Sequence, residues 1–353
     1  MMNNKLTLLN EIKQYIPYDD RLSNEDKERL LSLDCNFITE WAKVVFDYFY
    51  SHLSDSGEII SLNQFLLKNE KNKEHYKKVE ELFISNLLKK QKPLFFFDVD
   101  NTLTNWGELS KQKIDFIKNF PHKHRIILTT GKTYDSILSV VKDCGLEGNY
   151  ASCLNGSVLV ENGKVKALEK IGKISEEIVK SFENAPFDTI VYYEDYIRLL
   201  RPLTEKNYNF LKTYTEKYLE EKIIDYNKVV KVLFFIDEGE IDKEEIVKKV
   251  VKNYPNLVCM RTSNQTYEIL NKNQHKGNTV KIISKLMGNH YRATIGVGDS
   301  MNDSPLLSHV GKPYVVSTAS WELKNFNYDV LEENRDVDIV NLIKRYTKGE
   351  KYE

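Results

Sequence analysis

The fold of this chain is decided by the stretch Leu94-Phe95-Phe96-Phe97-Asp98-Val99-Asp100-Asn101-Thr102-Leu103-Thr104. Its apolar start is typical of a strand buried on both faces. The run stops at Asp98 and Asp100, which are two residues apart and therefore leave the same face of an extended backbone. Open α/β sheets bind ligands at the carboxyl ends of their strands. The stretch therefore predicts a site for a cation and an electrophile. The alternative is a solvated acidic turn, since Asp and Asn are common in turns.

Four downstream segments favour the functional interpretation. They are the apolar run 125–129 followed by Thr130-Gly131-Lys132, the pair Asn155-Gly156, the segment His275-Lys276-Gly277 that opens an amphipathic stretch, and residues 295–303, where a strand-like run ends in glycines and paired aspartates. A single motif carries a real risk of a false match, whereas several in a fixed order carry much less.

Together and in this order, the segments resemble the four motifs of the haloacid dehalogenase (HAD) superfamily. Asp98–Thr102 resembles motif I, Thr130-Gly131 motif II, Lys276-Gly277 motif III and residues 298–303 motif IV. The long insert before motif III, with Asn155-Gly156 just ahead of it, resembles the Cof-type (class IIB) branch. The resemblance covers residues 92–345. It implies an α/β fold: a Rossmann-like parallel sheet core with an inserted α+β cap of the C2B type.

The order of expected elements agrees with this organisation. Strand and helix patterns alternate over residues 94–160, which is typical of a parallel, doubly wound sheet. We expect the catalytic core at 91–160 and 271–353, and the substrate-specificity cap at 161–270. Residues 1–90 lie outside the HAD pattern and predict a helical N-terminal domain, because apolar residues recur there at helical spacing. That domain could serve a homo-oligomer or a protein partner.

The resemblance implies phosphoryl transfer, which needs a nucleophile, a proton donor and positive charge around the transferred group. Asp98 would be the nucleophile and form an aspartyl-phosphate intermediate. Asp100 would protonate the leaving oxygen and later activate water. Thr130 would donate its hydroxyl to a phosphoryl oxygen, and Lys276 would bind the same oxygens as a point charge.

The same resemblance implies a Mg²⁺ site. Asp98, Asp299 and the backbone carbonyl of Asp100, completed by water, suit an octahedral ion that prefers few carboxylates. Asp303 would be a direct ligand or would orient a metal-bound water. Asn302 would bind phosphate or orient Lys276.

Some positions depart from the branch pattern. Lys132 stands where arginine is common, which removes any bidentate contact. Asn101 stands where glycine is frequent, and asparagine also tolerates turn conformations. Lys132 and Asn155 are candidates for substrate contacts, whereas His275 is expected to be a linker. In the cap, polar residues could face the cleft, although charged residues are mostly exposed; these are Arg198, Arg201, Arg261, Asn264 and Glu268.

Composition excludes several classes of function. The chain carries 51 basic and 52 acidic side chains, so no bulk field points to nucleic acid or to an anionic membrane. Cys35, Cys144, Cys153 and Cys259 show no metal-ligand spacing, which is typical of reduced thiols in a cytoplasmic protein. No apolar run approaches the roughly 18 residues needed to cross a bilayer.

The sequence therefore predicts a cytoplasmic, Mg²⁺-dependent phosphomonoesterase for a small phosphorylated metabolite, with a sugar phosphate as the expected substrate. That substrate rests on the resemblance alone. The alternatives are a hexose-phosphate mutase of the same superfamily and a non-catalytic HAD-fold binding protein. A binding role alone would not require all five of the polar motif residues Asp98, Asp100, Thr130, Lys276 and Asp299.

Overall fold

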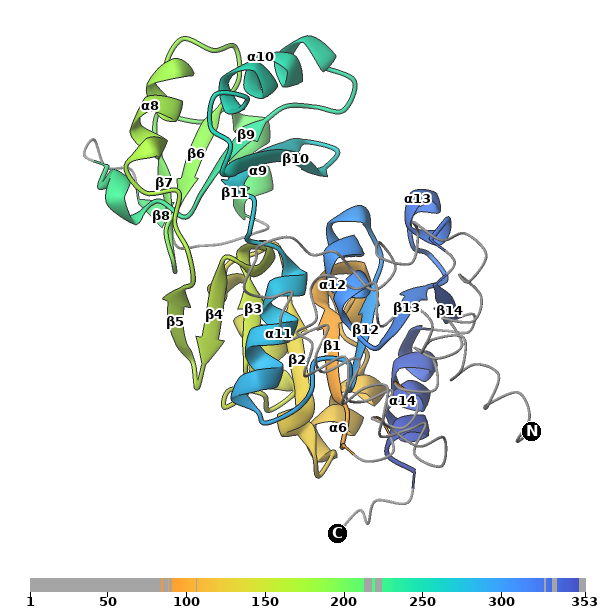
Figure 1. Cartoon of the computed structure of the whole chain (residues 1–353). Coiled ribbons are helices and arrows are strands. Elements are labelled where there is room, and N and C mark those ends of the chain that lie inside the picture. Colours follow the sequence, from red (N-terminus) through yellow and green to blue (C-terminus); the bar gives the residue numbers. More distant parts are fainter. Residues whose placement is uncertain are drawn as a thin grey trace, which may run out of the picture. The chain divides into compact units, whose positions relative to one another are not determined.

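The computed structural model describes residues 91–105, 107–212, 218–219, 224–326, 328–331 and 335–348, together with Ile84 and Leu88. The chain divides into two compact units, Met1–Lys90 and Gln91–Glu353. The predicted helices of residues 1–90 lie outside the described residues, so the N-terminal domain stays a prediction. The second unit contains two sheets with their helices (Figure 1).

The larger sheet has eight strands in the order β14-β13-β12-β1-β2-β3-β4-β5. All pairs from β14 to β3 are parallel, and the hairpin β4–β5 closes one edge with antiparallel pairs. The strands are β1 (Leu94–Asp98), β2 (Ile126–Thr129), β3 (Ala151–Cys153), β4 (Val158–Glu161), β5 (Lys164–Ala167), β12 (Thr294–Gly298), β13 (Lys312–Val316) and β14 (Asp329–Leu331).

Every residue of the central strands β1, β2 and β12 is buried, as expected for a parallel sheet covered on both faces. The helices that follow these strands are typical crossover connections, and α6 packs against α14. The core helices are α6 (Lys111–Asn119), α7 (Leu138–Asp143), α11 (Lys276–Leu286), α12 (Ser304–His309), α13 (Trp321–Lys324) and α14 (Arg335–Tyr346).

The insert has a six-stranded sheet of its own in the order β10-β11-β9-β6-β7-β8. Its core packs around Phe182, Phe187 and Phe234, whose ring centroids lie 4.8–5.8 Å apart. The insert contains α8 (Ile174–Ser181), β6 (Thr189–Tyr192), β7 (Ile197–Leu199), α9 (Glu205–Lys212), β8 (Tyr218–Leu219), β9 (Lys231–Phe235), α10 (Ile241–Val251), β10 (Leu257–Ser263) and β11 (Thr266–Asn271).

The predicted fold class, a parallel α/β core with an inserted α+β cap, is confirmed. Three local predictions differ from the structure. The apolar spacing from Leu203 to Leu219 predicts one helix, whereas the described helix α9 covers Glu205–Lys212 and Tyr218–Leu219 pairs as a strand with β7. β5 belongs to the larger sheet, although it lies after the boundary at residue 161. The sequence predicts a helix from Thr279 to Met287, whereas α11 runs over Lys276–Leu286, so Lys276 and Gly277 lie in its first turn.

Within the described ranges, no helix combines the length and the apolar character that crossing a bilayer requires.

Candidate active site

The site lies at the carboxyl ends of three neighbouring strands. β1 lies between β2 and β12, and Asp98 at its end is opposite Thr129 of β2. Asp299 directly follows the last residue of β12. The register therefore brings motifs I, II and IV to one edge of the sheet, where open α/β folds bind their ligands.

Directly after Asp98 the chain turns through Val99–Leu103. Asn101 adopts a left-handed conformation there, with φ 56°, which explains why asparagine is tolerated where glycine is frequent. The turn is closed on the carbonyl oxygen of Val99, which accepts hydrogen bonds from the backbone N–H and the hydroxyl of Thr104 at 2.8 and 3.0 Å. This turn places Asp100 beyond the end of the strand.

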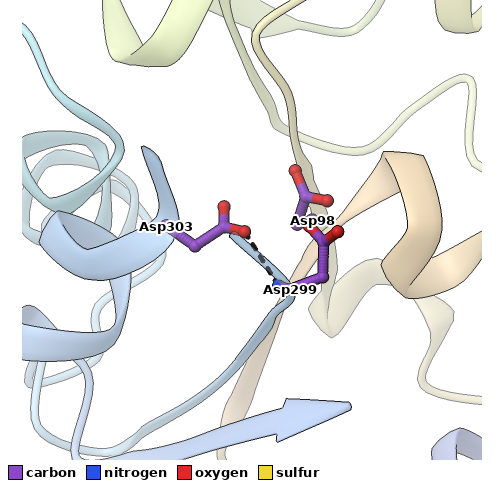
Figure 2. Close-up of side chains that lie close together, drawn as sticks. All are labelled: Asp98, Asp299 and Asp303. Carbon is purple, nitrogen blue, oxygen red and sulfur yellow. Dashed lines mark hydrogen bonds between the residues drawn. The ribbon is translucent and has the colours of Figure 1, made fainter. Parts of the chain in front are cut away.

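Asp98, Asp299 and Asp303 form an acidic cluster (Figure 2). Each offers one carboxylate oxygen, and these oxygens lie within 4.8 Å of one another. The second oxygen of Asp303 accepts from the backbone N–H groups of Asp299 and Ser300 at 3.0 and 3.2 Å. Gly298 permits this packing, because a Cβ there would lie 2.5 Å from the Cβ of Asp303. The cluster is therefore built into the strand–turn–helix of motif IV.

Lys276 lies between two of these carboxylates. Its Nζ donates to Asp98 Oδ1 at 2.5 Å and to Asp303 Oδ1 at 2.6 Å, and its side chain is fully buried. Burial alone would lower the pKa of Lys276, but Asp303 and Asp98 outweigh it and raise that pKa. Burial and Asp303 raise the pKa of Asp98 well above its usual range, and Lys276 opposes them. Three carboxyl groups therefore share a single ammonium group.

These residues fit a divalent cation. Carboxylate oxygens are the ligands that Mg²⁺ prefers, and three of them converge within the required range. Burial, followed by the negative charges of Asp303 and Asp299, raises the pKa of Asp98, and a bound cation would offset those like charges. Asp98, Asp299 and Asp303 are the residues that would hold it. The side chain of Asp100 forms an ion pair with Lys132, while its backbone carbonyl stays a predicted metal ligand.

The Asp100–Lys132 pair connects motifs I and II. Lys132 Nζ lies 2.8 Å from Asp100 Oδ1, and the two side chains are 18% and 37% exposed. The backbone N–H of Lys132 donates to the Thr130 hydroxyl at 3.1 Å. Thr130 is buried, and its own N–H donates to Ser152 on the adjacent strand. Lys132 therefore contacts the proposed acid directly, a contact that was not anticipated from the sequence.

Motif III is fixed by the close packing of α11 against α12. A Cβ on Gly277 would lie 2.3 Å from the carbonyl oxygen of Pro305 and 2.5 Å from His309, so only glycine fits. His275 and His309 lie beside this contact, with ring centroids 5.1 Å apart. Burial lowers the pKa of His275 to about 4 and that of His309 to about 3. His275 is consequently a half-buried residue that packs against His309, and its linker role stays a prediction.

Among the remaining candidates, Asn302 accepts a 2.5 Å hydrogen bond from the Ser300 hydroxyl. Asn155 has a left-handed φ of 55° and is buried. Its Nδ2 donates to Glu268 of the insert at 3.3 Å. The three arginines suggested for the cleft contact the insert itself: Arg198 lies over Tyr193 and Tyr196, Arg201 donates to Ala185 and Phe187, and Arg261 pairs with Glu244.

Lys231 was not predicted from the sequence to be a residue of the site. Its side chain is 1% exposed, and its Nζ lies 2.8 Å from Glu268 Oε1 and 3.3 Å from the carbonyl oxygen of Gly131. A signal for it existed, because Lys231 interrupts the apolar run Val229-Val230-Lys231-Val232-Leu233. A lysine inside a buried strand is almost always paired.

A comparison with known families matches a model of the haloacid dehalogenase-like hydrolases to residues 95–343. The glucosyl-3-phosphoglycerate/mannosyl-3-phosphoglycerate phosphatase of Persephonella marina is 25% identical over 248 residues, covering 66% of this chain and 88% of that protein.

Two solved structures share the fold. TM0651 from Thermotoga maritima has a TM-score of 0.63 at 19% identity, covering 72% of this chain and 97% of that one. The HAD subclass IIB sugar phosphatase BT4131 has a TM-score of 0.60 at 21% identity, covering 72% of this chain and 98% of that one.

Proposed function

This chain belongs to the haloacid dehalogenase-like hydrolase family and is a phosphatase of the HAD type, and we propose that it hydrolyses a small phosphorylated metabolite in a Mg²⁺-dependent reaction through an aspartyl-phosphate. The observation that carries the proposal is the contact of Lys276 with both Asp98 and Asp303 beside Asp299. That arrangement supports the proposal, because the carboxylate proposed as nucleophile, a buried ammonium group and the proposed cation ligands lie together at one edge of the sheet.

In the first half-reaction, an oxygen of Asp98 attacks phosphorus, and the bond from phosphorus to the leaving oxygen breaks. Asp100 gives its proton to that oxygen, so the product leaves as an alcohol. Lys276 and the Thr130 hydroxyl offer positive charge and a hydrogen bond to the phosphoryl oxygens. A bound divalent cation would supply further neutralisation of the phosphoryl charge.

In the second half-reaction, Asp100 accepts a proton from water while the water oxygen attacks phosphorus. The acyl-phosphate bond breaks, phosphate leaves, and the Asp98 carboxylate is regenerated. Lys132 holds the Asp100 carboxylate in place between the two steps. The ammonium of Lys132 cannot make the bidentate contact of the arginine that is common at this position, since lysine binds as a point charge.

We infer a sugar phosphate as the substrate class. The names of two similar proteins, one a glucosyl- and mannosyl-phosphoglycerate phosphatase and one a sugar phosphatase, support this inference. The insert has a hydrophobic core of its own, and its Glu268 accepts a hydrogen bond from Asn155 of the catalytic core. Both observations support a role of the insert in substrate choice. Roles for residues 1–90 in an oligomer or with a protein partner, and the cytoplasmic location, stay predictions.

The test is phosphate release from a panel of sugar phosphates, nucleotides and other metabolites, with Mg²⁺ or with a chelator. Wild type is compared with Asp98→Asn, and Asp143→Asn on the exposed side of α7 is the control. We expect release that requires Mg²⁺, that the first substitution abolishes and that the control retains. A folded protein that binds Mg²⁺ but releases no phosphate, or only moves phosphate within a hexose phosphate, would contradict the phosphatase.

A further inference from the structure

The motif II loop, Thr130-Gly131-Lys132, receives hydrogen bonds from two parts of the chain. The carbonyl oxygens of Thr130 and Lys132 accept from the backbone N–H groups of Asn155 and Leu154, both at 3.0 Å. The carbonyl oxygen between them, that of Gly131, accepts from Lys231 at 3.3 Å. Two of the three donors thus belong to the core, and the middle one belongs to the insert.

Lys231 is held where it can make this contact. Lys231 is on β9 and Glu268 on β11, and Glu268 pairs in register with Leu233, two residues from Lys231. Such diagonal neighbours lie on the same face of a sheet, within reach of long side chains. Lys231 Nζ also lies 4.2 Å from the ring centroid of Tyr192 on β6. The ammonium is therefore fixed from three strands of the insert sheet.

Glu268 closes the network on the core side. One oxygen pairs with Lys231 at 2.8 Å, and the other accepts from Asn155 Nδ2 at 3.3 Å. Asn155 is the residue whose backbone N–H binds Thr130. Its Oδ1 is buried without a hydrogen-bond partner among the described residues, and it lies 3.1 Å from where a Cβ of Gly131 would be. The insert thus contacts the loop directly through Lys231 and indirectly through Glu268.

We propose that Lys231, held by Glu268, is a positioning residue that completes the motif II loop when the cap is docked. The inference rests on the proposed function. By holding Gly131, Lys231 fixes the residues on either side of it: Thr130, which faces the phosphate, and Lys132, which holds the carboxylate of Asp100. Docking of the cap therefore sets the position of the proton donor.

A role that acts through Asp100 depends on the leaving group, because an alkoxide must be protonated as it leaves, whereas nitrophenolate leaves without a proton. The experiment compares phosphate release from p-nitrophenyl phosphate with release from the sugar phosphate that wild type turns over fastest. The main variant is Lys231→Met with Glu268→Gln. It replaces the buried pair by neutral groups of similar volume, a change that proteins often tolerate.

We expect kcat/KM, which covers only the steps up to formation of the aspartyl-phosphate, to fall about fivefold for the sugar phosphate and less than about twofold for p-nitrophenyl phosphate, because the effect passes through the single Lys132–Asp100 pair. The control pairs Lys206→Met with Asp237→Asn, which removes an exposed cap ion pair of 2.6 Å, and should match wild type on both substrates. Equal falls on both substrates, or no fall, in a folded variant would overturn the inference. Wild type that releases phosphate from neither substrate would overturn the proposed function itself.

If the main variant does not fold, Lys231→Arg decides the question. It keeps the charge opposite Glu268, but its planar fork moves the donor away from the Gly131 carbonyl oxygen. We then expect kcat/KM for the sugar phosphate to fall roughly threefold more than kcat/KM for p-nitrophenyl phosphate. Equal losses on the two substrates would overturn the inference here as well.

Discussion

Lys276 and Lys231 are both buried lysines paired with carboxylates, but different parts of the fold hold them. Lys276 contacts Asp98 and Asp303, and all three residues belong to the core. Lys231 pairs with Glu268 inside the insert and reaches a core loop only through the Gly131 carbonyl oxygen. The first cluster can be broken only by disrupting the core. The second spans two sheets and could separate whenever the insert moves. We call Lys276, Asp98 and Asp303 the permanent cluster, and Lys231 and Glu268 the conditional cluster. The first is proposed to take part in the reaction and the second to control it.

The strongest test of the permanent cluster is Lys276→Met. The change leaves Asp98 and Asp303 buried without their cation, which we expect to cost about 3–5 kcal/mol of unfolding free energy and most of the activity. Mg²⁺ should recover part of the stability, since it would neutralise the same carboxylates. Thermal unfolding with and without Mg²⁺ measures both effects. Lys231→Met is the matched variant and should show no recovery by Mg²⁺; equal recovery in both would contradict the distinction between the clusters.

The next effect concerns the proton donor that the conditional cluster is proposed to control. Asp100→Asn should lower kcat for sugar phosphates by about 10²- to 10⁴-fold, equivalent to about 2.7–5.4 kcal/mol. For p-nitrophenyl phosphate, kcat/KM should fall much less, because it covers only the steps up to the aspartyl-phosphate, in which this leaving group needs no proton. Steady-state kinetics on both substrates provides the measurement. A uniform loss would mean that Asp100 acts on phosphate binding instead.

Acid should weaken the region behind Lys276, where the rings of His275 and His309 pack together. The folded pKa values of His275 and His309, about 4 and about 3, lie below the unfolded value near 6.5. Their stabilisation is therefore present above about pH 6.5 and is lost as pH falls toward the folded values, at up to about 1.4 kcal/mol per pH unit for each residue. Urea unfolding between pH 7 and 5 measures the slope. Replacing both histidines by Phe should flatten it, and an unchanged slope would refute their involvement.

The smallest expected effect is that of Lys132→Gln. The Asp100–Lys132 pair is partly exposed, and such pairs contribute roughly 0.2–1 kcal/mol, so we expect at most about a fivefold loss of kcat. The loss should diminish at high salt as the wild-type pair becomes screened. Kinetics at low and high salt would reveal this. A loss above a hundredfold would instead place Lys132 on the substrate.

The place of the permanent cluster could be predicted from sequence, because Asp98 ends one buried strand, Thr130 and Asp299 directly follow two others, and the ends of these neighbouring strands meet. The contacts of Lys276 with Asp98 and Asp303 were not predicted. Asp98, Thr130, Asp299 and Asp303 each stand within a short motif, and the sheet order brings those motifs together. The roles assigned to these residues remain proposals.

The conditional cluster could not be predicted in this way. Lys231 and Glu268 meet only because β9 pairs with β11 at one register, and the linear sequence does not specify that register. Glu268 could be suggested as a cleft residue, but nothing distinguished it from Arg198 or Arg261. Likewise, helical periodicity across 203–219 could not show that tertiary pairing with β7 would make Tyr218–Leu219 a strand.

The position of β1 between β2 and β12 also has a consequence for how the protein is made. β2 ends at residue 129 and β12 begins at residue 294, which is 165 residues later, and the whole insert lies between them. At about 5–20 residues per second of synthesis, the strand that carries Asp98 waits about 8–33 seconds for its second neighbour. The insert can form its own core during that interval. We therefore expect the cap of the nascent chain to fold before β12 pairs with β1 and completes the catalytic edge of the sheet.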